Sequence, residues 1–125
     1  MGRAAETGRR GEELAEAYVQ QLGWDVLARN FSAPGGEIDL VCVEGGGSAR
    51  TLVFVEVKTR RTTAFGEPEA ALTTRKIDRL SSAADAYIYA NGEEDVPCRF
   101  DCIGIILAGP AHQPEIRHFK DITGF

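Results

Sequence analysis

Three charged residues at the ends of two apolar runs carry the most chemistry in this sequence. Asp39 lies in the run EIDLVCV, and Glu56 and Lys58 end the run TLVFVEVK, with the stretch EGGGSAR between the runs. Apolar, β-branched runs on both sides of a glycine-rich turn predict the two strands of a β-hairpin. A loop centred between Gly47 and Ser48 then places Asp39 directly opposite Glu56 in an antiparallel pair.

The two faces of the predicted hairpin support this register, because side chains alternate between the faces of a strand. A shift of one residue would set apolar residues against polar ones. One face is wholly apolar and must be covered by another layer; it holds Ile38, Leu40, Cys42, Val53, Val55 and Val57. The other face changes from apolar to charged away from the turn, in the pairs Val43 with Leu52, Val41 with Phe54, Asp39 with Glu56, and Glu37 with Lys58.

Two opposed carboxylates raise the pKa of one of them or need a positive charge nearby. Two sources of that charge are open here, Lys58 or a divalent cation held by Asp39 and Glu56. Mg²⁺ takes one or two protein carboxylates and leaves positions for water and phosphate oxygens. Two acids and a lysine around a metal predict a centre that cleaves phosphodiester bonds. An exposed ladder of ion pairs is the alternative, and it fits less well because Asp39 has no cation opposite it.

The elements that must position these residues alternate between helices and strands. Amphipathic periodicity and turn residues predict helices at Gly8–Leu22 and Thr74–Ala90, and strands at Trp24–Phe31, Glu37–Val43, Thr51–Lys58, Cys98–Leu107 and Ile116–Phe119. This order predicts an α/β fold with a sheet of about five strands and a helix on each face. The length predicts one domain, 1–125, in which residues 1–7 form a flexible N-terminal segment.

The composition is that of a soluble globular protein, with 43% apolar and 26% charged residues. No stretch is long and apolar enough to span a bilayer, so no membrane partner is expected. The N-terminal MGRAAETGRRGEE is charged where a signal peptide would be apolar, which predicts a cytoplasmic location. Cys42, Cys98 and Cys102 form no even set and no C-x-x-C pair, so they are predicted to be small buried residues in a reducing compartment.

The remaining polar residues suggest little other chemistry. His112 and His118 have no zinc-ligand spacing with the cysteines, so neither a zinc site nor a histidine-based nuclease is predicted. Arg99 and Asp101 share one face of a predicted strand, which predicts a structural ion pair.

The motifs around the hairpin resemble a known pattern. Asp39, sixteen intervening residues and then Glu56-Val57-Lys58 resemble the signature of the PD-(D/E)XK nuclease superfamily, although Pro34 does not directly precede the metal acid. The stretches GRRGEELAEAYVQQLGW, ARNF, GGEIDL, VFVEVKTRR, FG, Lys76 and CRFD follow one another in an order similar to that of the bacterial UPF0102 or YraN-like family, itself distantly similar to archaeal Holliday junction resolvases.

The resemblance implies a restriction-endonuclease-like core, a mixed sheet, and a DNA endonuclease that uses Mg²⁺ or Mn²⁺ on branched or non-duplex DNA. It assigns Asp39 and Glu56 to the metal and Lys58 to the attacking water or the developing charge. The superfamily often adds an acid from the first helix. Glu12 matches the family's Gly-Glu position and falls at the rim of the apolar stripe, unlike Glu13 and Glu16. A favourable acid in a first helical turn remains the other interpretation of Glu12.

Basic residues near the predicted site are candidates for phosphate contacts, although the net charge of −5 argues against a nucleic-acid partner for the chain as a whole. They are Arg9, Arg10, Arg60, Arg61 and Lys76, and ordinary surface charge is the alternative for each. DNA is the expected partner. Paired cuts in a junction would also require a homodimer. A non-catalytic nucleic-acid-binding or adaptor domain that keeps the fold is the alternative function.

Overall fold

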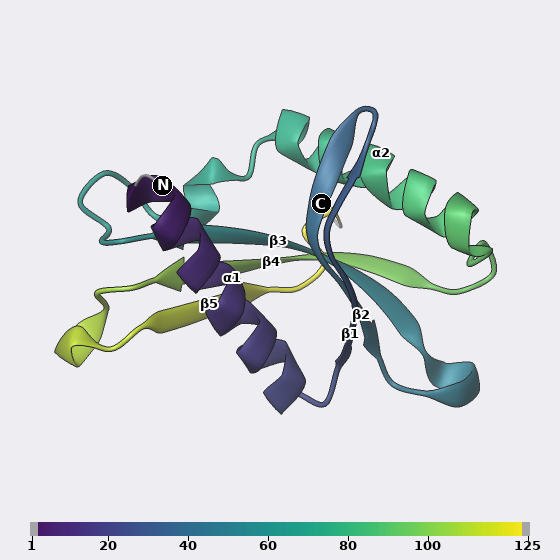
Figure 1. The fold of residues 1–125 in the computed structure, drawn as a ribbon, viewed down its shortest axis with the longest axis horizontal. Helices are drawn as coiled ribbons and strands as arrows, with labels where there is room; N and C mark the ends of the chain where they lie inside the picture. The colour runs from purple at the N-terminus through teal and green to yellow at the C-terminus, as the bar shows by residue number, and fades with distance from the viewer. Residues whose placement is uncertain (1–2, 124–125) are drawn as a thin grey trace.

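The computed structural model describes residues 3–123 and shows two helices packed on a mixed five-stranded sheet (Figure 1). The helices are α1 (Arg3–Gln21) and α2 (Thr74–Asn91), and the strands are β1 (Asp25–Ala33), β2 (Gly36–Glu44), β3 (Thr51–Arg60), β4 (Cys98–Ile106) and β5 (Glu115–Phe119). Three short 3₁₀ helices lie in the loops, η1 (Gly47–Ala49), η2 (Pro68–Ala71) and η3 (Pro110–His112). The predicted α/β architecture is confirmed and is consistent with a restriction-endonuclease-like core.

The strands follow one another across the sheet in the order β1-β2-β3-β4-β5. All neighbours are antiparallel except β3 and β4, which run parallel. A parallel pair needs a long crossover between its strands, and here α2 provides it. Because α2 follows the end of β3 directly through η2, the charged end of β3 lies close in sequence to the basic start of this helix.

The two helices cover opposite faces of the sheet, as predicted. Beneath α2, a cluster of buried side chains includes Val41, Phe54 and Leu80. Beneath α1, a second cluster includes Val19 and Val55. Each strand in the centre of the sheet therefore buries both of its faces, which explains the nearly continuous apolar sequences of β2 and β3.

One predicted core position differs in the structure. Ile38 packs in the cluster beneath α2, and does not lie with Leu40 and Cys42 beneath α1. The hairpin of β1 and β2 bends toward α2 near its tip, where Gly36 lies against the backbone of Arg79. A Cβ atom at Gly36 would lie 2.0 Å from the Arg79 carbonyl oxygen, so this close approach requires glycine. The bend carries Ile38 to the α2 side, which strict alternation along a straight strand does not predict.

Helix boundaries follow local signals in α2 more closely than in α1. The Thr73 side chain caps α2 by accepting a hydrogen bond from the Lys76 amide, and Gly92 ends it in the left-handed conformation. Helix α1 begins at Arg3, five residues before the predicted start at Gly8. It therefore includes residues 3–7 of the segment 1–7 that is predicted to be flexible, and this flexibility stays a prediction. Residues 1–2 lie outside the described part of the chain.

Two further expectations can be compared with residues 3–123. Cys42 and Cys102 are buried as predicted, whereas Cys98 is exposed because it begins β4 at the rim of the sheet. Neither described helix is long and apolar enough to cross a membrane.

Candidate active site

The candidate site forms where β2 and β3 separate. Their ladder confirms the predicted register, with Val43 opposite Leu52 and Val41 opposite Phe54. The ladder ends at the pair of Leu40 and Val55, so the predicted pairs of Asp39 with Glu56 and of Glu37 with Lys58 lie beyond it and are not ladder pairs.

Beyond the last pair of the backbone ladder, the side chain of Asp39 connects the two strands. The Val57 backbone N–H donates a hydrogen bond to Asp39 Oδ2 at 2.7 Å. This bond joins β2 to β3 through a carboxylate and fixes the orientation of that carboxylate. Asp39 therefore stays next to Glu56 although the two backbones have begun to diverge.

The environment of Asp39 disfavours its charge. Burial raises the pKa of Asp39, and the nearby Glu56 raises it further, while the hydrogen bond from Val57 opposes both effects. Smaller contributions from Glu12 and Glu37 also raise it, and the pKa of Asp39 reaches about 7. Asp39 is thus close to half-protonated at neutral pH. A cation bound next to it would strongly favour its ionised form.

Glu56 lies in a related environment. Burial raises the pKa of Glu56, and the positive charges of Lys76 and Lys58 lower it, while Glu37 and Glu12 raise it. Within residues 5–123, Glu56 and Lys58 make no direct ion pair or side-chain hydrogen bond with each other or with other described residues. Lysines therefore bias the charge of this site without neutralising either carboxylate by contact.

Helix α1 brings one of its three candidate acids to this region. Burial raises the pKa of Glu12, the Asn30 side chain opposes this by hydrogen bonding, and Glu37 adds to the rise. Glu16 instead forms an ion pair with Arg29, and Glu13 is exposed. The structure thus places Glu12, and neither of its neighbours on α1, in the electrostatic environment of Asp39 and Glu56.

Glu37 is a further acid of the site that the predicted list of functional residues omits. It is exposed, and its charge affects the pKa of Glu12, Asp39 and Glu56. Its place two residues before Asp39 on the same strand was a usable signal, because alternate residues share a face.

A divalent cation suits the chemistry of this donor set. Asp39 and Glu56 supply the hard oxygen ligands that Mg²⁺ and Mn²⁺ prefer, and both carboxylates carry raised pKa values that a cation would reverse. Within the described part of the chain, no group of three or more histidine, cysteine, aspartate or glutamate side chains is arranged to hold a metal. A cation at this place would have Asp39 and Glu56 as its protein ligands, with water or substrate oxygens as the others.

Two grooves open on opposite sides of the end of β3. The larger, here called the α1 groove, has a volume of about 860 Å³ and is lined in part by Glu12, Lys58, Arg60, Arg61 and Phe65. The smaller, here called the α2 groove, has a volume of about 380 Å³, and Glu37, Glu56, Arg75, Lys76 and Arg79 contribute to its lining. Glu12 and Lys58 thus line the α1 groove and Glu56 lines the α2 groove, whereas Asp39 lines neither.

The predicted phosphate-contacting residues are divided as well. Arg60 and Arg61 line the α1 groove, and Lys76 lines the α2 groove. Arg9 and Arg10 are exposed on α1 and line neither groove. Only three of the five predicted residues are therefore gathered around the acids.

Comparison with known proteins identifies the family. Residues 11–105 match the family described as "Uncharacterised protein family UPF0102". This chain belongs to the UPF0102 family. The matched segment contains Glu12, Asp39, Glu56 and Lys58, and it excludes Arg9 and Arg10.

Similar UPF0102 proteins share most of the chain. A "UPF0102 protein" of Geobacter sulfurreducens is 46% identical over 114 residues, which cover 91% of this chain and 85% of that protein. A relative from Dehalococcoides mccartyi is 36% identical over 119 residues, covering 95% of this chain and 93% of the relative. One from Syntrophomonas wolfei is 44% identical over 102 residues, covering 82% of this chain and 85% of the relative.

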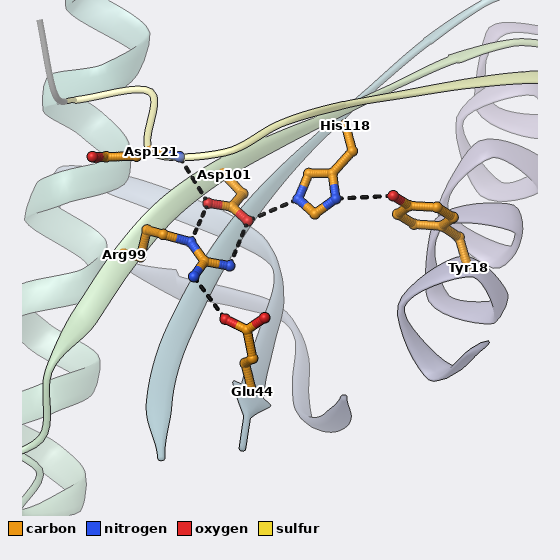
Figure 2. Close-up of polar contacts among 6 residues, drawn as sticks. All are labelled: Tyr18, Glu44, Arg99, Asp101, His118 and Asp121. Carbon is orange, nitrogen blue, oxygen red and sulfur yellow. Dashed lines mark hydrogen bonds and ion pairs between the residues drawn. The ribbon is translucent and has the colours of Figure 1, made fainter. Parts of the chain in front are cut away.

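This UPF0102 protein also contains a second polar cluster, which Figure 2 shows around Asp101 on β4. The predicted ion pair is confirmed, since Arg99 Nε donates to Asp101 Oδ1 at 2.9 Å and Arg99 Nη2 donates to Asp101 Oδ2 at 3.1 Å. The Asp121 amide donates to Asp101 at 3.0 Å, and Arg99 also binds Glu44 at 2.7 Å. Asp101 is fully buried.

His118 connects this cluster to α1. Its Nε2 lies 2.8 Å from Asp101 Oδ2, and its Nδ1 lies 3.0 Å from the Tyr18 hydroxyl (Figure 2). Burial alone would raise the pKa of Asp101, but hydrogen bonds from His118, Arg99 and the Asp121 amide outweigh it and lower that pKa to about 2. The sequence did not predict this role of His118, because the contact depends on the register of β5 against β4, and Tyr18 on α1 is far from both strands in the chain.

Proposed function

We propose that this protein is a metal-dependent endonuclease that hydrolyses phosphodiester bonds in DNA, with branched or non-duplex DNA as its substrate. The observation that carries the proposal is the pair of Asp39 and Glu56, two neighbouring carboxylates with raised pKa values and no cation in direct contact among the described residues. A structural role would favour neutralising such a pair, because uncompensated buried charges lower stability. A divalent cation bound by both carboxylates would neutralise the pair and account for this arrangement.

In this proposal, Asp39 and Glu56 would hold Mg²⁺ or Mn²⁺. A bound metal of this kind polarises a phosphate and lowers the pKa of a water. The Val57 amide restrains Asp39 through its Oδ2 atom, which limits the motion that the carboxylate could make on binding. Preorganisation of this type reduces the reorganisation needed during the reaction.

Lys58 and Glu12 act beside this pair. Both line the α1 groove, so the ammonium group of Lys58 can orient a water or stabilise negative charge on a phosphate that enters there. Glu12 would orient Lys58 or help to hold the metal through a water. Arg60, Arg61 and Lys76 contact neighbouring phosphates from the two grooves, which supplies affinity that does not depend on base sequence.

A cleavage screen tests the proposal. Duplex, single-stranded, flap and four-way-junction DNA are incubated with Mn²⁺ and the wild-type protein, Glu56→Gln or Lys58→Ala. We expect cleavage of at least one non-duplex substrate, and a loss of about a hundredfold or more in each variant, as for the removal of one group that stabilises a transition state.

Matched controls separate the site from general charge effects. Glu94→Gln and Lys120→Ala make the same changes at exposed positions that line neither groove, and both should cleave like the wild type. Cleavage that persists equally in Glu56→Gln and Lys58→Ala would show that the assigned residues are not the catalytic ones.

A second candidate is a non-catalytic nucleic-acid-binding or adaptor domain. The observation that favours it is that Glu56 and Lys58 line different grooves, so the residues of the proposed centre do not converge on one groove. This candidate predicts DNA binding at low salt, where basic residues are least screened, with no cleavage of any substrate in Mg²⁺ or Mn²⁺.

A further inference from the structure

Phe65 is the most exposed large apolar side chain among the described residues. It is 98% exposed, and it lies at the α1 groove in the loop that follows β3. A phenyl ring exposed to water lacks the free energy that burial of its apolar surface would contribute. The loop around it is ordered by local hydrogen bonds, from the Gly66 amide to the Thr63 carbonyl at 3.1 Å and from the Ala64 amide to the Thr62 hydroxyl at 3.2 Å.

The same groove contains positive charge without direct counter-charge. Arg60 and Arg61 both line it, and neither forms an ion pair with another described residue. The Nε atom of Arg60 is buried and has no hydrogen-bond partner in the described structure, which is costly for a polar group. In a chain whose net charge is −5, these arginines and Lys58 form a local cationic surface.

The backbone of the two arginines is anchored, whereas their side chains face the groove. The Leu107 amide donates to the Arg60 carbonyl, and the Ala108 amide donates to the Arg61 carbonyl, each at 2.9 Å. These bonds extend the pairing of β3 with the end of β4. The α1 groove therefore combines an exposed aromatic ring with two cations at the anchored end of β3, and it also contains Glu12 of the proposed active site.

A nucleotide of a single strand matches this combination of groups. Its phosphates complement the arginines, and its base presents a flat face that can stack on an aromatic ring. In a duplex, neighbouring base pairs cover those faces, so an exposed ring gains little there. A peptide or lipid with anionic groups would satisfy the arginines but would not need a stacking surface.

We propose that the α1 groove binds an unpaired segment of DNA, with one base stacked on Phe65 and its phosphates at Arg60 and Arg61. This inference rests on the proposed nuclease function and explains a preference for branched or non-duplex DNA. The unpaired strand at a branch point would enter the α1 groove while the scissile phosphate reaches Asp39 and Glu56.

Fluorescence anisotropy at low salt in EDTA tests the inference without involving a metal or cleavage. The probes are a labelled oligothymidylate and an abasic oligomer with the same number of phosphates. We expect Phe65→Ala to weaken binding of the oligothymidylate by about tenfold, within the range for loss of one stacked base, and to leave binding of the abasic oligomer unchanged. Phe65→Trp should retain the wild-type affinity for both.

Tyr89→Ala is the matched control, because Tyr89 is 82% exposed on α2 and lines neither groove. It should bind both oligomers like the wild type. Equal affinities of wild type and Phe65→Ala for the oligothymidylate, or an equal loss for the two oligomers, would overturn stacking on Phe65 while leaving the proposed nuclease function intact. If the wild type binds neither oligomer, the proposed DNA substrate fails together with this inference.

Discussion

Asp39 on β2 and Asp101 on β4 lie in one sheet with β3 between them, and they occupy opposite electrostatic environments. Asp101 accepts hydrogen bonds from Arg99, the Asp121 amide and His118, and its pKa falls to about 2. Asp39 accepts one hydrogen bond, from the Val57 amide, and its pKa rises to about 7. Burial favours the protonated form at both positions, so the difference comes from the partners.

The two acidic residues therefore have different roles in the same fold. The Asp101 cluster joins α1, β2, β4, β5 and the C-terminal turn through compensated charges (Figure 2). The Asp39 region leaves carboxylates without direct cationic partners among the described residues and next to open grooves. A charge with a structural role is paired with opposite charges of the protein itself, whereas a candidate functional charge is one that a bound cation or ligand would neutralise.

The largest expected effect separates the two aspartates by stability. Asp101→Asn should lower the free energy of unfolding by about 3 kcal/mol at neutral pH, because Arg99 and His118 lose the charge that compensates them in a buried setting. Asp39→Asn keeps a carbonyl oxygen for the Val57 amide and removes repulsion with Glu56, so it should be neutral or stabilising. Urea unfolding of both variants measures the difference, and equal losses would contradict the contrast drawn between the two sites.

The next effect concerns pH and metal. In the folded protein the pKa of Asp39 is raised to about 7, so folding favours the protonated carboxyl group. The contribution of Asp39 to stability is therefore complete at a pH below the pKa of the unfolded state, and it is lost as the pH rises through about 7. The lowered pKa of Asp101 acts in the opposite direction, giving stability that is lost as pH falls from about 4 toward 2.

A cation should reverse the effect at Asp39. At a concentration one hundred times its Kd, Mn²⁺ should stabilise the protein by about 2.7 kcal/mol, and its affinity should be greater at about pH 8 than at about pH 5, since protons compete for the same oxygens. Thermal unfolding with and without Mn²⁺ measures this, and Asp39→Asn is the control. Stabilisation that is the same in the variant would place the cation elsewhere.

The smallest of these effects tests how the Asp39 region is held in place. Gly36→Ala would put a Cβ atom 2.0 Å from the Arg79 carbonyl oxygen and force the tip of the β1–β2 hairpin away from α2, so we expect a loss of about 1 to 3 kcal/mol. Gly46→Ala is the control, because a Cβ atom there meets nothing within 4 Å and its φ of −152° suits any residue. Chemical unfolding of the two variants should differ, and similar stabilities would mean that the tip tolerates displacement.

Much of the candidate site could be predicted because its signals are local. Alternation along β2 and β3 places Val41 opposite Phe54, and the same alternation carries Asp39, Glu56 and Lys58 to the end of the hairpin. Helical periodicity also separates Glu12 from Glu13 on α1. These signals depend on geometry that repeats every two residues in a strand and every 3.6 in a helix.

The sequence by itself determined the elements, the hairpin register near the turn and the acids at its open end. Tertiary structure decided where the ladder stops, so that a side chain of Asp39 and not its backbone meets Val57. It also turned Ile38 toward α2 and brought His118 to Asp101. Local periodicity contains no information about such contacts, because they depend on how the hairpin bends onto a helix and on the register in which β5 pairs with β4.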